Sequence, residues 1–466
     1  MTKMSQSEAP AAVPPDAQVA ARSGAPGAAQ AAFVYPLVLL LGFLMPPAAR
    51  CQALPAAEAS PISTGFTLPR IAGTLQYAVS ASESLSWGYY GNSGTDSVSN
   101  VSGDIAYLSG STNYPFSMIF SGGRGWSTSL QPSYNYLNLA LSQVINAGRW
   151  NFVVSDGVSY LPSTPTTGLS GVPGVGDLSV DPVQVGDQTG QGVLTNYSAR
   201  VGNIASGSLQ RQLTGKTSVQ GSGSYSITRF VGNSANGGLS SDVVGGSGGL
   251  SHRFDTRNTV SGNYMYSSYS YPSYANSSFT YGAGQPGYGS QTASLQYTRQ
   301  LTRKLGINLS GGPQWTSIAS SSAAPTPNLY ASVAATYAGE FSHASMVYTR
   351  GTNSGSGVIG GAISNSVGGS ASRTLDRVWN CAVSASYTNT GGLPSTTATP
   401  YTFHTVVAGA QASRALVRSL SVYGSYTLEK QSNLSVAVAA DVYSGLTQVV
   451  GFGLTYSPSS IHFGRQ

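Results

Sequence analysis

The segment that decides the fold begins at Thr74 and runs to Tyr89, with the sequence TLQYAVSASESLSWGY. Its odd-numbered positions are apolar or aromatic apart from Glu83, and its even-numbered positions are mostly Ser, Thr or Gln. A period of two is that of a β-strand, whose successive side chains point to opposite faces. The segment is therefore predicted to be a strand with one apolar face and one neutral polar face.

The same alternation recurs along the chain as far as Tyr456, for example over 305–315, 379–387, 420–428 and 450–456. A soluble β-sandwich also alternates, but its polar face meets bulk water and usually carries Lys, Glu and Arg. Here that face carries small neutral residues, as in strands whose apolar face meets lipid and whose polar face lines a wet lumen. We therefore predict an all-β, antiparallel transmembrane β-barrel.

The composition agrees with this prediction. Only 8% of the 466 residues are charged and 40% are apolar, whereas a soluble globular domain carries about 25% charged residues. The one long apolar run lies near the N-terminus, from Phe33 to Met45, so a bundle of membrane helices is excluded. The charge deficit also argues against an ordinary cytoplasmic enzyme.

The N-terminal region has the pattern of a secretory signal. The apolar run from Phe33 to Met45 is shorter than the roughly 20 residues of a spanning helix, and small residues at Cys51 and Ala53 suit cleavage after Ala53. An uncleaved N-terminal anchor is the alternative, and a lipid-modified Cys51 fits less well because Arg50 precedes it. The predicted divisions are a signal peptide with a long front extension over 1–53, a short periplasmic segment over 54–71, a barrel over 72–457 and a C-terminal tail over 458–466.

Cleavage after Ala53 leaves a chain with few charges and one cysteine. Its net charge of about +5 is too dilute to indicate a nucleic-acid partner. Cys381 is then the only cysteine, so an intramolecular disulfide is excluded. Because Cys381 shares a face with Trp379 and Val383, it is interpreted as a lipid-facing structural residue.

Link lengths give the strand number. Eight short links, such as Thr214–Lys216 and Ser342–His343, alternate with nine longer ones, such as Pro162–Thr195 and Gly351–Ser356. Barrels of the outer membrane have short turns on the periplasmic side, longer loops outside and an even strand number. The links predict about eighteen strands, with sixteen as the alternative.

With these patterns, the region from residue 70 to 460 resembles the outer-membrane β-barrel class of Gram-negative bacteria, including porins. The final strand adds to the resemblance, because Gly451, Leu454 and Tyr456 look like the signal by which such barrels are recognised for insertion. The resemblance implies a chain exported through the inner membrane, inserted by the barrel-assembly machinery and surrounded by outer-membrane lipid.

The resemblance also suggests where a pore would narrow. In porins the third external loop folds into the barrel, and here that loop would be 162–195, which contains Asp177, Asp181 and Asp187 and no Lys or Arg. An exposed loop with solvated acids is the alternative, whereas the spacing of the three Asp fits no EF-hand loop. Strand alternation points further charged residues inward, which are the other pore-lining candidates: Asp104, Arg200, Arg253, Glu340 and Glu429.

Catalytic and cofactor chemistry finds little support in the sequence. The four His residues, His252, His343, His404 and His462, have no metal-pair spacing. Ser is so common that any Ser-His-Asp assignment would be arbitrary. We expect no enzyme activity, no catalytic residue, no metal and no cofactor.

Two classes of function remain. The first is a diffusion channel for small hydrophilic, weakly charged solutes, with polysaccharide export as a narrower version. The second is a non-conducting surface protein, an adhesin or receptor that uses its external loops. Inward Ser and Gly would favour an open pore, and inward tyrosines such as Tyr330 and Tyr423 a plugged one. A soluble secreted β protein is a third possibility, and the sequence leaves the oligomeric state undetermined.

Overall fold

The computed structural model describes residues 73–88, 94–127, 133–161, 199–231, 239–272, 287–319, 324–357, 359–393, 402–433 and 444–463. The chain divides into two units, Met1–Ala49 and Arg50–Gln466. All described residues belong to the second unit, so the predicted signal peptide and the segment 54–71 lie outside them.

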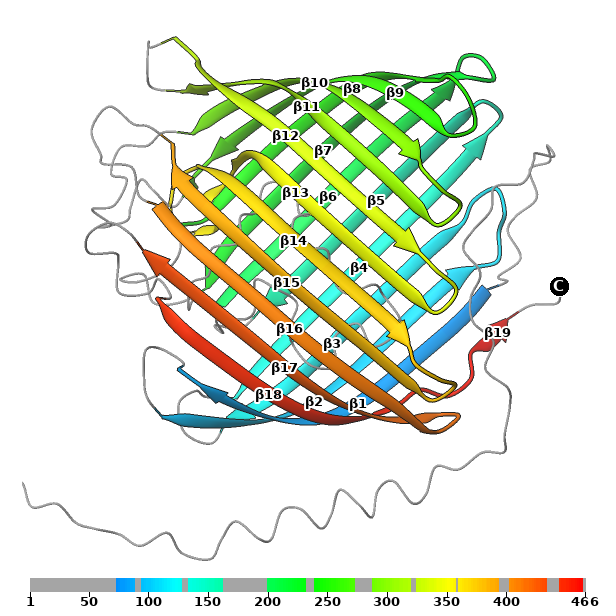
Figure 1. Cartoon of the computed structure of the whole chain (residues 1–466), viewed down its shortest axis with the longest axis vertical. Coiled ribbons are helices and arrows are strands. Elements are labelled where there is room, and N and C mark those ends of the chain that lie inside the picture. Colours follow the sequence, from blue (N-terminus) through cyan, green and yellow to red (C-terminus); the bar gives the residue numbers. More distant parts are fainter. Residues whose placement is uncertain are drawn as a thin grey trace, which may run out of the picture. The chain divides into compact units, whose positions relative to one another are not determined.

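The second unit is a closed antiparallel barrel of eighteen strands (Figure 1). Each strand pairs with its neighbours in sequence, and β1 closes the barrel by pairing with both β2 and β18. The strands are β1 Gly73–Trp87, β2 Thr95–Ser109, β3 Phe116–Ser127, β4 Tyr134–Ala147, β5 Trp150–Leu161, β6 Ala199–Gln212, β7 Thr217–Val231, β8 Ser241–Arg253, β9 Asn258–Ser270, β10 Tyr288–Gln300, β11 Leu305–Ile318, β12 Thr326–Ala338, β13 Ser342–Asn353, β14 Ala362–Thr374, β15 Trp379–Gly392, β16 Thr402–Val417, β17 Leu420–Asn433 and β18 Gly445–Tyr456. The prediction of an all-β antiparallel barrel with eighteen strands is confirmed.

A nineteenth strand lies in the segment predicted to be a plain C-terminal tail. Strand β19, Ile461–Phe463, pairs with the first residues of β1, Gly73 to Leu75. Strand β19 can pair there because the pairing of β1 with β18 begins only at Val79, so the first residues of β1 have no partner on β18. The chain after Tyr456 therefore continues the sheet along the edge that β18 leaves open.

The two faces of the barrel have opposite chemistry. Large apolar side chains point outward and are strongly exposed, such as Val154 at 57%, Leu295 at 63% and Phe452 at 62%. Buried residues of the opposite parity are mainly Ser, Thr, Asn and Gln. This is the arrangement required where hydrocarbon surrounds a sheet that encloses a wet interior, because every backbone group is paired around the ring.

All five tryptophans of the chain lie on the outer face, at two levels. Trp87, Trp126 and Trp315 lie where β1, β3 and β11 end, at the barrel end that carries the longer links. Trp150 and Trp379 begin β5 and β15, at the end with the short turns. Two aromatic levels that bracket an apolar band are typical of a barrel that spans a bilayer.

We call these two ends the loop end and the turn end. The turn between β12 and β13 corrects one boundary, because Ser342 and His343 were predicted as the link and instead begin β13. The turn consists of residues 339–341, directly before Ser342, and its Gly339 N–H donates to the Ser342 carbonyl at 2.7 Å. The described part of the chain contains no membrane-spanning helix; its helical element is the 3-10 turn η5, Gly355–Gly357.

Candidate functional site: the polar lumen and an inward link

The inner wall is a neutral hydrogen-bonding surface. Hydroxyl and amide groups of neighbouring strands bond to one another, as in Gln314 to Thr292 at 3.1 Å and Thr405 to Gln431 at 3.1 Å. Ser80 on β1 and Thr455 on β18 form a similar pair at 3.0 Å across the seam that closes the barrel. A wall of this kind offers donors and acceptors to water or to a neutral solute without presenting a strong charge.

Inward tyrosines do not fill the lumen where they face glycine. Tyr136 and Tyr423, each about 4% exposed, are the register partners of Gly123 and Gly453 on the neighbouring strand. A Cβ at either glycine would lie within 2.6 Å of the tyrosine ring, so the ring lies flat over the space that the glycine leaves. The prediction that Tyr423 points inward is correct, but its ring follows the wall.

The lumen is instead narrowed by the connection between β13 and β14. We call residues 353–357 and 359–361 the inward link. The β12–β13 ladder ends at the pair Ala331–Arg350, although β12 starts at Thr326 and β13 continues to Asn353. The loop-end part of β13 therefore leaves β12, and the inner residue Tyr330 lies 3.5 Å from the position of a Cβ on Gly351.

Two tyrosines hold the first residues of the inward link. The hydroxyl of Tyr288, on β10, donates to the Asn353 carbonyl at 2.6 Å, and that of Tyr271, after β9, donates to the Ser354 carbonyl at 3.2 Å. Burial raises the pKa of Tyr271, so this phenol stays protonated and remains a donor. Thr352 adds a bond of 3.0 Å to Ser290 on β10.

The tip of the link reaches β7 and β8, strands that lie six and five places from β13 in barrel order. The Leu239 N–H donates to the Gly357 carbonyl at 2.8 Å. Gly357 has a φ of +78°, and a Cβ there would lie 2.1 Å from the ring of Phe230. Only glycine combines that backbone angle with so close a contact.

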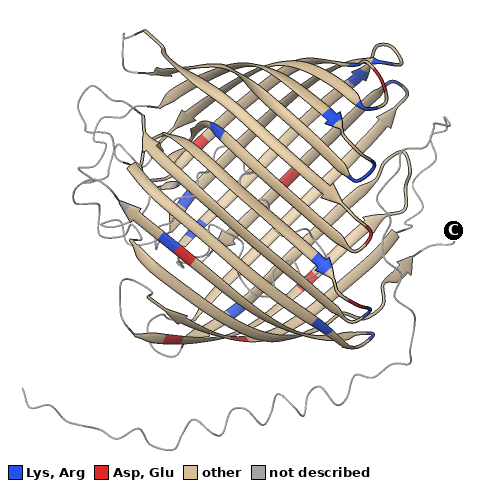
Figure 2. Ribbon diagram, viewed as in Figure 1, with Lys and Arg blue, Asp and Glu red and all other residues tan. Residues whose placement is uncertain are grey.

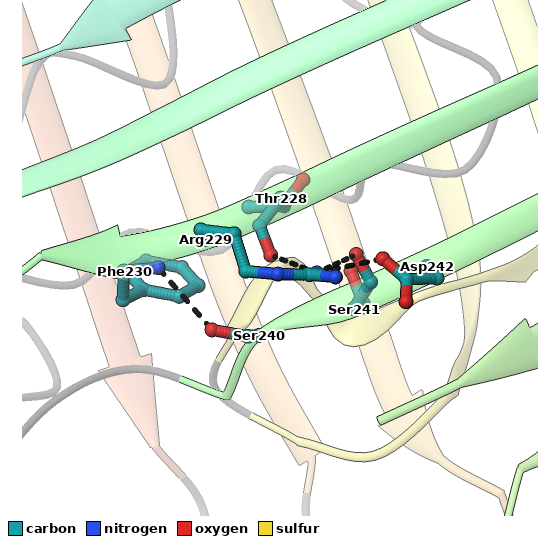
Figure 3. A network of polar contacts seen from close by, with 6 residues as sticks. All are labelled: Thr228, Arg229, Phe230, Ser240, Ser241 and Asp242. Carbon is teal, nitrogen blue, oxygen red and sulfur yellow. Dashed lines mark hydrogen bonds and ion pairs between the residues drawn. The ribbon is translucent and has the colours of Figure 1, made fainter. Parts of the chain in front are cut away.

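The wall under this tip is fixed by polar contacts between β7 and β8 (Figure 3). Arg229 pairs with Asp242 at 2.6 Å and donates to the Ser241 carbonyl at 3.2 Å. The Phe230 N–H donates to the Ser240 hydroxyl at 3.3 Å. These bonds hold the loop ends of both strands together where the inward link docks.

An aromatic cluster lies between the link and the wall. Tyr269 and Tyr288 stack with ring centroids 4.3 Å apart, and Tyr271 and Leu393 complete the buried group. Leu393 follows β15 and donates its N–H to the Gly361 carbonyl at 3.3 Å. The loop ends of β13, β14 and β15 therefore converge on the inner faces of β9 and β10.

The charged candidates from the sequence divide into three groups. Asp104, Arg200 and Glu429 lie at inward positions, and Asp104 and Glu429 are 2% and 0% exposed. Arg253 ends β8 at the turn end, where it is exposed and donates to the Gly215 carbonyl at 2.9 Å. Glu340 lies in the β12–β13 turn rather than on an inward strand position, because β12 ends at Ala338.

The acids at 177, 181 and 187 lie outside the described residues, as does the whole of loop 162–195. Within the described part, no group of three His, Cys, Asp or Glu residues is placed to hold a metal ion.

Sequence reasoning missed the inward link. Residues 351–356 were assigned only as a longer external link. A signal was present in Gly355, Gly357, Gly360 and Gly361, a glycine density suited to unusual backbone angles and close approach. The contacts that identify its docking site come from residues distant in sequence.

No family model matches the chain, and no curated protein matches it. Solved structures with similar barrels include OpdL of Pseudomonas aeruginosa, at 8% identity and a TM-score of 0.39, covering 84% of this chain and 99% of that one. OprD of the same organism gives 12% identity and a TM-score of 0.37 over 84% and 94% of the two chains. The siderophore receptor PiuA from Acinetobacter baumannii gives 9% and 0.37 over 84% and 82%.

These similarities are too low to carry a function to this chain. The class follows from the barrel itself: eighteen antiparallel strands, a closed ring, an apolar outer face with two tryptophan levels and a polar inner face. The chain is a porin-like β-barrel protein of the outer-membrane type.

Proposed function

We propose that the protein is a passive outer-membrane channel for small hydrophilic solutes of low charge. The observation that carries the proposal is the inner wall, in which Ser, Thr, Asn and Gln are the main buried residues. A solute that enters such a lumen exchanges its bonds to water for bonds to hydroxyl and amide groups. Selection is then by width and by the field of a few wall charges, rather than by a chemical step.

The inward link supplies the narrow part. It lies at the loop end, held by Tyr271, Tyr288 and the Leu239 N–H. Loop 162–195, with its acids at 177, 181 and 187, remains a second proposed contribution to the constriction. Among the inward charges, Asp104 and Glu429 are expected to favour cations, and Arg200 opposes them on another sector of the wall.

Export and insertion are further parts of the proposal. The chain would lose residues 1–53 at the inner membrane and would be inserted by the barrel-assembly machinery through Gly451, Leu454 and Tyr456. These three residues lie on β18, the strand that closes the barrel with β1. The mass of the protein extracted from outer membranes tests the cleavage directly, since an intact N-terminus would exclude it.

The docked link also supports a second candidate, a barrel closed at the loop end that acts as a surface protein. Its basis is the buried aromatic cluster, which seals the link against β9 and β10. Polysaccharide export is not favoured by any contact of the described residues, and a link that crosses the lumen would obstruct a wide polymer.

Conductance of the purified protein in a planar lipid bilayer tests the channel. We expect steady openings, with permeation of small uncharged sugars in a liposome-swelling assay and exclusion of larger ones. Heat-modifiable migration on a gel establishes beforehand that the barrel is folded. Folded protein with neither conductance nor swelling would refute the channel and favour the closed surface protein.

A further inference from the structure

The charges of the barrel are distributed unequally between its two ends. Of the seventeen Lys and Arg residues in the described part, twelve lie in a short turn or within four residues of one, between Arg149 and Arg418. We call these twelve residues the basic belt. Only Asp255, Glu340 and Asp376 among the described acids lie at the same level, and Figure 2 shows the blue segments gathered at the turn end.

The belt lies at the level of the turn-end tryptophans. Arg211 is the register partner of Trp150, and its guanidinium carbon lies 4.8 Å from the centroid of that ring. Arg414 is the register partner of Trp379, at 5.5 Å. Both pairs face outward, because Trp150 and Trp379 are exposed on the outer surface of the barrel.

Such a pair has the chemistry of a lipid headgroup site. An indole at the end of an apolar band lies at the boundary between acyl chains and headgroups, and the stacked arginine directs its donors to the same level. The ion pair of the described part, Arg229–Asp242, lies at the loop end. Neither Arg211 nor Arg414 forms an ion pair with a carboxylate of that part, although Asp376 lies close enough to Arg414 for the two charges to attract each other.

We propose that the outward Arg–Trp pairs Arg211–Trp150 and Arg414–Trp379, within the basic belt, bind the phosphate of anionic glycerophospholipids at the turn end of the barrel. Arginine binds phosphate with two parallel donors, and each basic residue near a membrane surface attracts anionic lipid. The two pairs lie on β5–β6 and β15–β16, so they form separate sites. The lipid would fix the depth and tilt of the barrel, independently of transport.

Tryptophan quenching provides the test. In a full-length protein with Trp87, Trp126 and Trp315 replaced by Phe, Trp150 and Trp379 are the remaining tryptophans, and they are excited at a wavelength where tyrosine does not absorb. The protein is folded into vesicles of phosphatidylcholine and phosphatidylglycerol, with brominated acyl chains on one lipid or the other. We expect stronger quenching by brominated phosphatidylglycerol, with a relative association constant of about fivefold over phosphatidylcholine, which decreases at high salt.

The combined variant Arg211→Gln and Arg414→Gln should reduce that ratio to about one. The matched control is Arg124→Gln, because Arg124 lies over an outward aromatic ring at the loop end, that of Trp126 in the parent protein and that of the replacing Phe in the test protein. It should leave the preference unchanged. Heat-modifiable migration verifies that each variant is folded, and channel conductance should be the same in all of them.

Four outcomes would overturn the proposal. Equal quenching by the two brominated lipids in the parent would show no anionic preference. A preference retained by the double variant would show that these arginines are not responsible. Loss of the preference on addition of free glycerol phosphate would indicate a site for soluble phosphate esters, and binding of polyglutamate without lipid preference would indicate an acidic protein partner.

Discussion

Replacing Tyr271 and Tyr288 with phenylalanine should release the inward link from the wall of the barrel. Each substitution removes a hydroxyl that donates to a link carbonyl, at 3.2 Å to Ser354 and at 2.6 Å to Asn353. The rings remain, so the stack of Tyr288 on Tyr269 is retained. The variant therefore removes the hydrogen bonds of these two hydroxyls, including those among the tyrosines, and leaves the ring packing in place.

The magnitude follows from the bonds that are lost. A neutral hydrogen bond contributes about 0.5–1.5 kcal/mol, so the pair contributes about 1–3 kcal/mol to the docked state of the link. That change shifts the ratio of docked to undocked link by about 5- to 150-fold. Single-channel recording should show a larger mean conductance or fewer long closures in the double variant than in the parent protein.

A matched control is the outward-facing Tyr264, whose hydroxyl donates to Gln291 at 3.1 Å. Tyr264→Phe loses a similar bond on the lipid side and should conduct like the parent. Hydrogen exchange at the Leu239 N–H, which donates to Gly357, measures undocking separately. Faster exchange with unchanged conductance would refute the assignment of the link as the constriction, and unchanged exchange would refute the role of the two tyrosines in docking.

Three further predictions concern single sites. Gly357→Ala should also increase conductance, because its φ of +78° and the ring of Phe230 leave no room for a Cβ, and a decrease would contradict the docked arrangement. Asp104→Asn and Glu429→Gln should each move the reversal potential in a salt gradient toward anion preference, since both remove inward negative charge; no change in either would exclude them as lumen charges. Asp376 accepts two backbone N–H bonds in the β14–β15 turn, which hold its pKa below the ordinary value. A carboxyl group whose pKa is lower in the folded than in the unfolded state stabilises the fold at pH values above the unfolded-state pKa, and this stabilisation is lost as pH falls. Asp376→Ala should therefore lower the urea midpoint at pH 7 and have little effect well below about pH 4. An equal decrease of the urea midpoint at both pH values would contradict a stabilisation by the ionised carboxylate.

The strands were predictable because their information is local. From Gly73 to Trp87 the side chains alternate between lipid and lumen, and a period of two is visible in the sequence without any partner strand. The absence of charge on the polar face then distinguished a lumen from bulk water. Boundaries were less certain. The link was predicted at Ser342–His343, which left Glu340 on a strand, whereas the turn begins three residues earlier, at Gly339, and includes Glu340.

The charged residues predicted to line the lumen also show that alternation does not place a residue along the length of a strand. Asp104 and Glu429 follow from alternation alone, because each lies inside a long strand. Arg253 has the inward parity but lies at the turn end, where it bonds to a turn carbonyl. Alternation predicts which face of the sheet a side chain lies on. It does not predict the height of the residue along the barrel axis, because that height depends on the stagger of all eighteen strands.

The sequence by itself therefore determined the class of the protein: an all-β chain whose neutral, alternating strands can be satisfied only by closing around a wet interior. Only the tertiary structure decided which link narrows that interior. The bonds that dock the link join residues 65 and 83 positions apart, and they form because the end of β13 leaves β12 and bends inward. The basic belt required the structure as well, since its residues are scattered along the sequence and meet at one level only when the barrel closes.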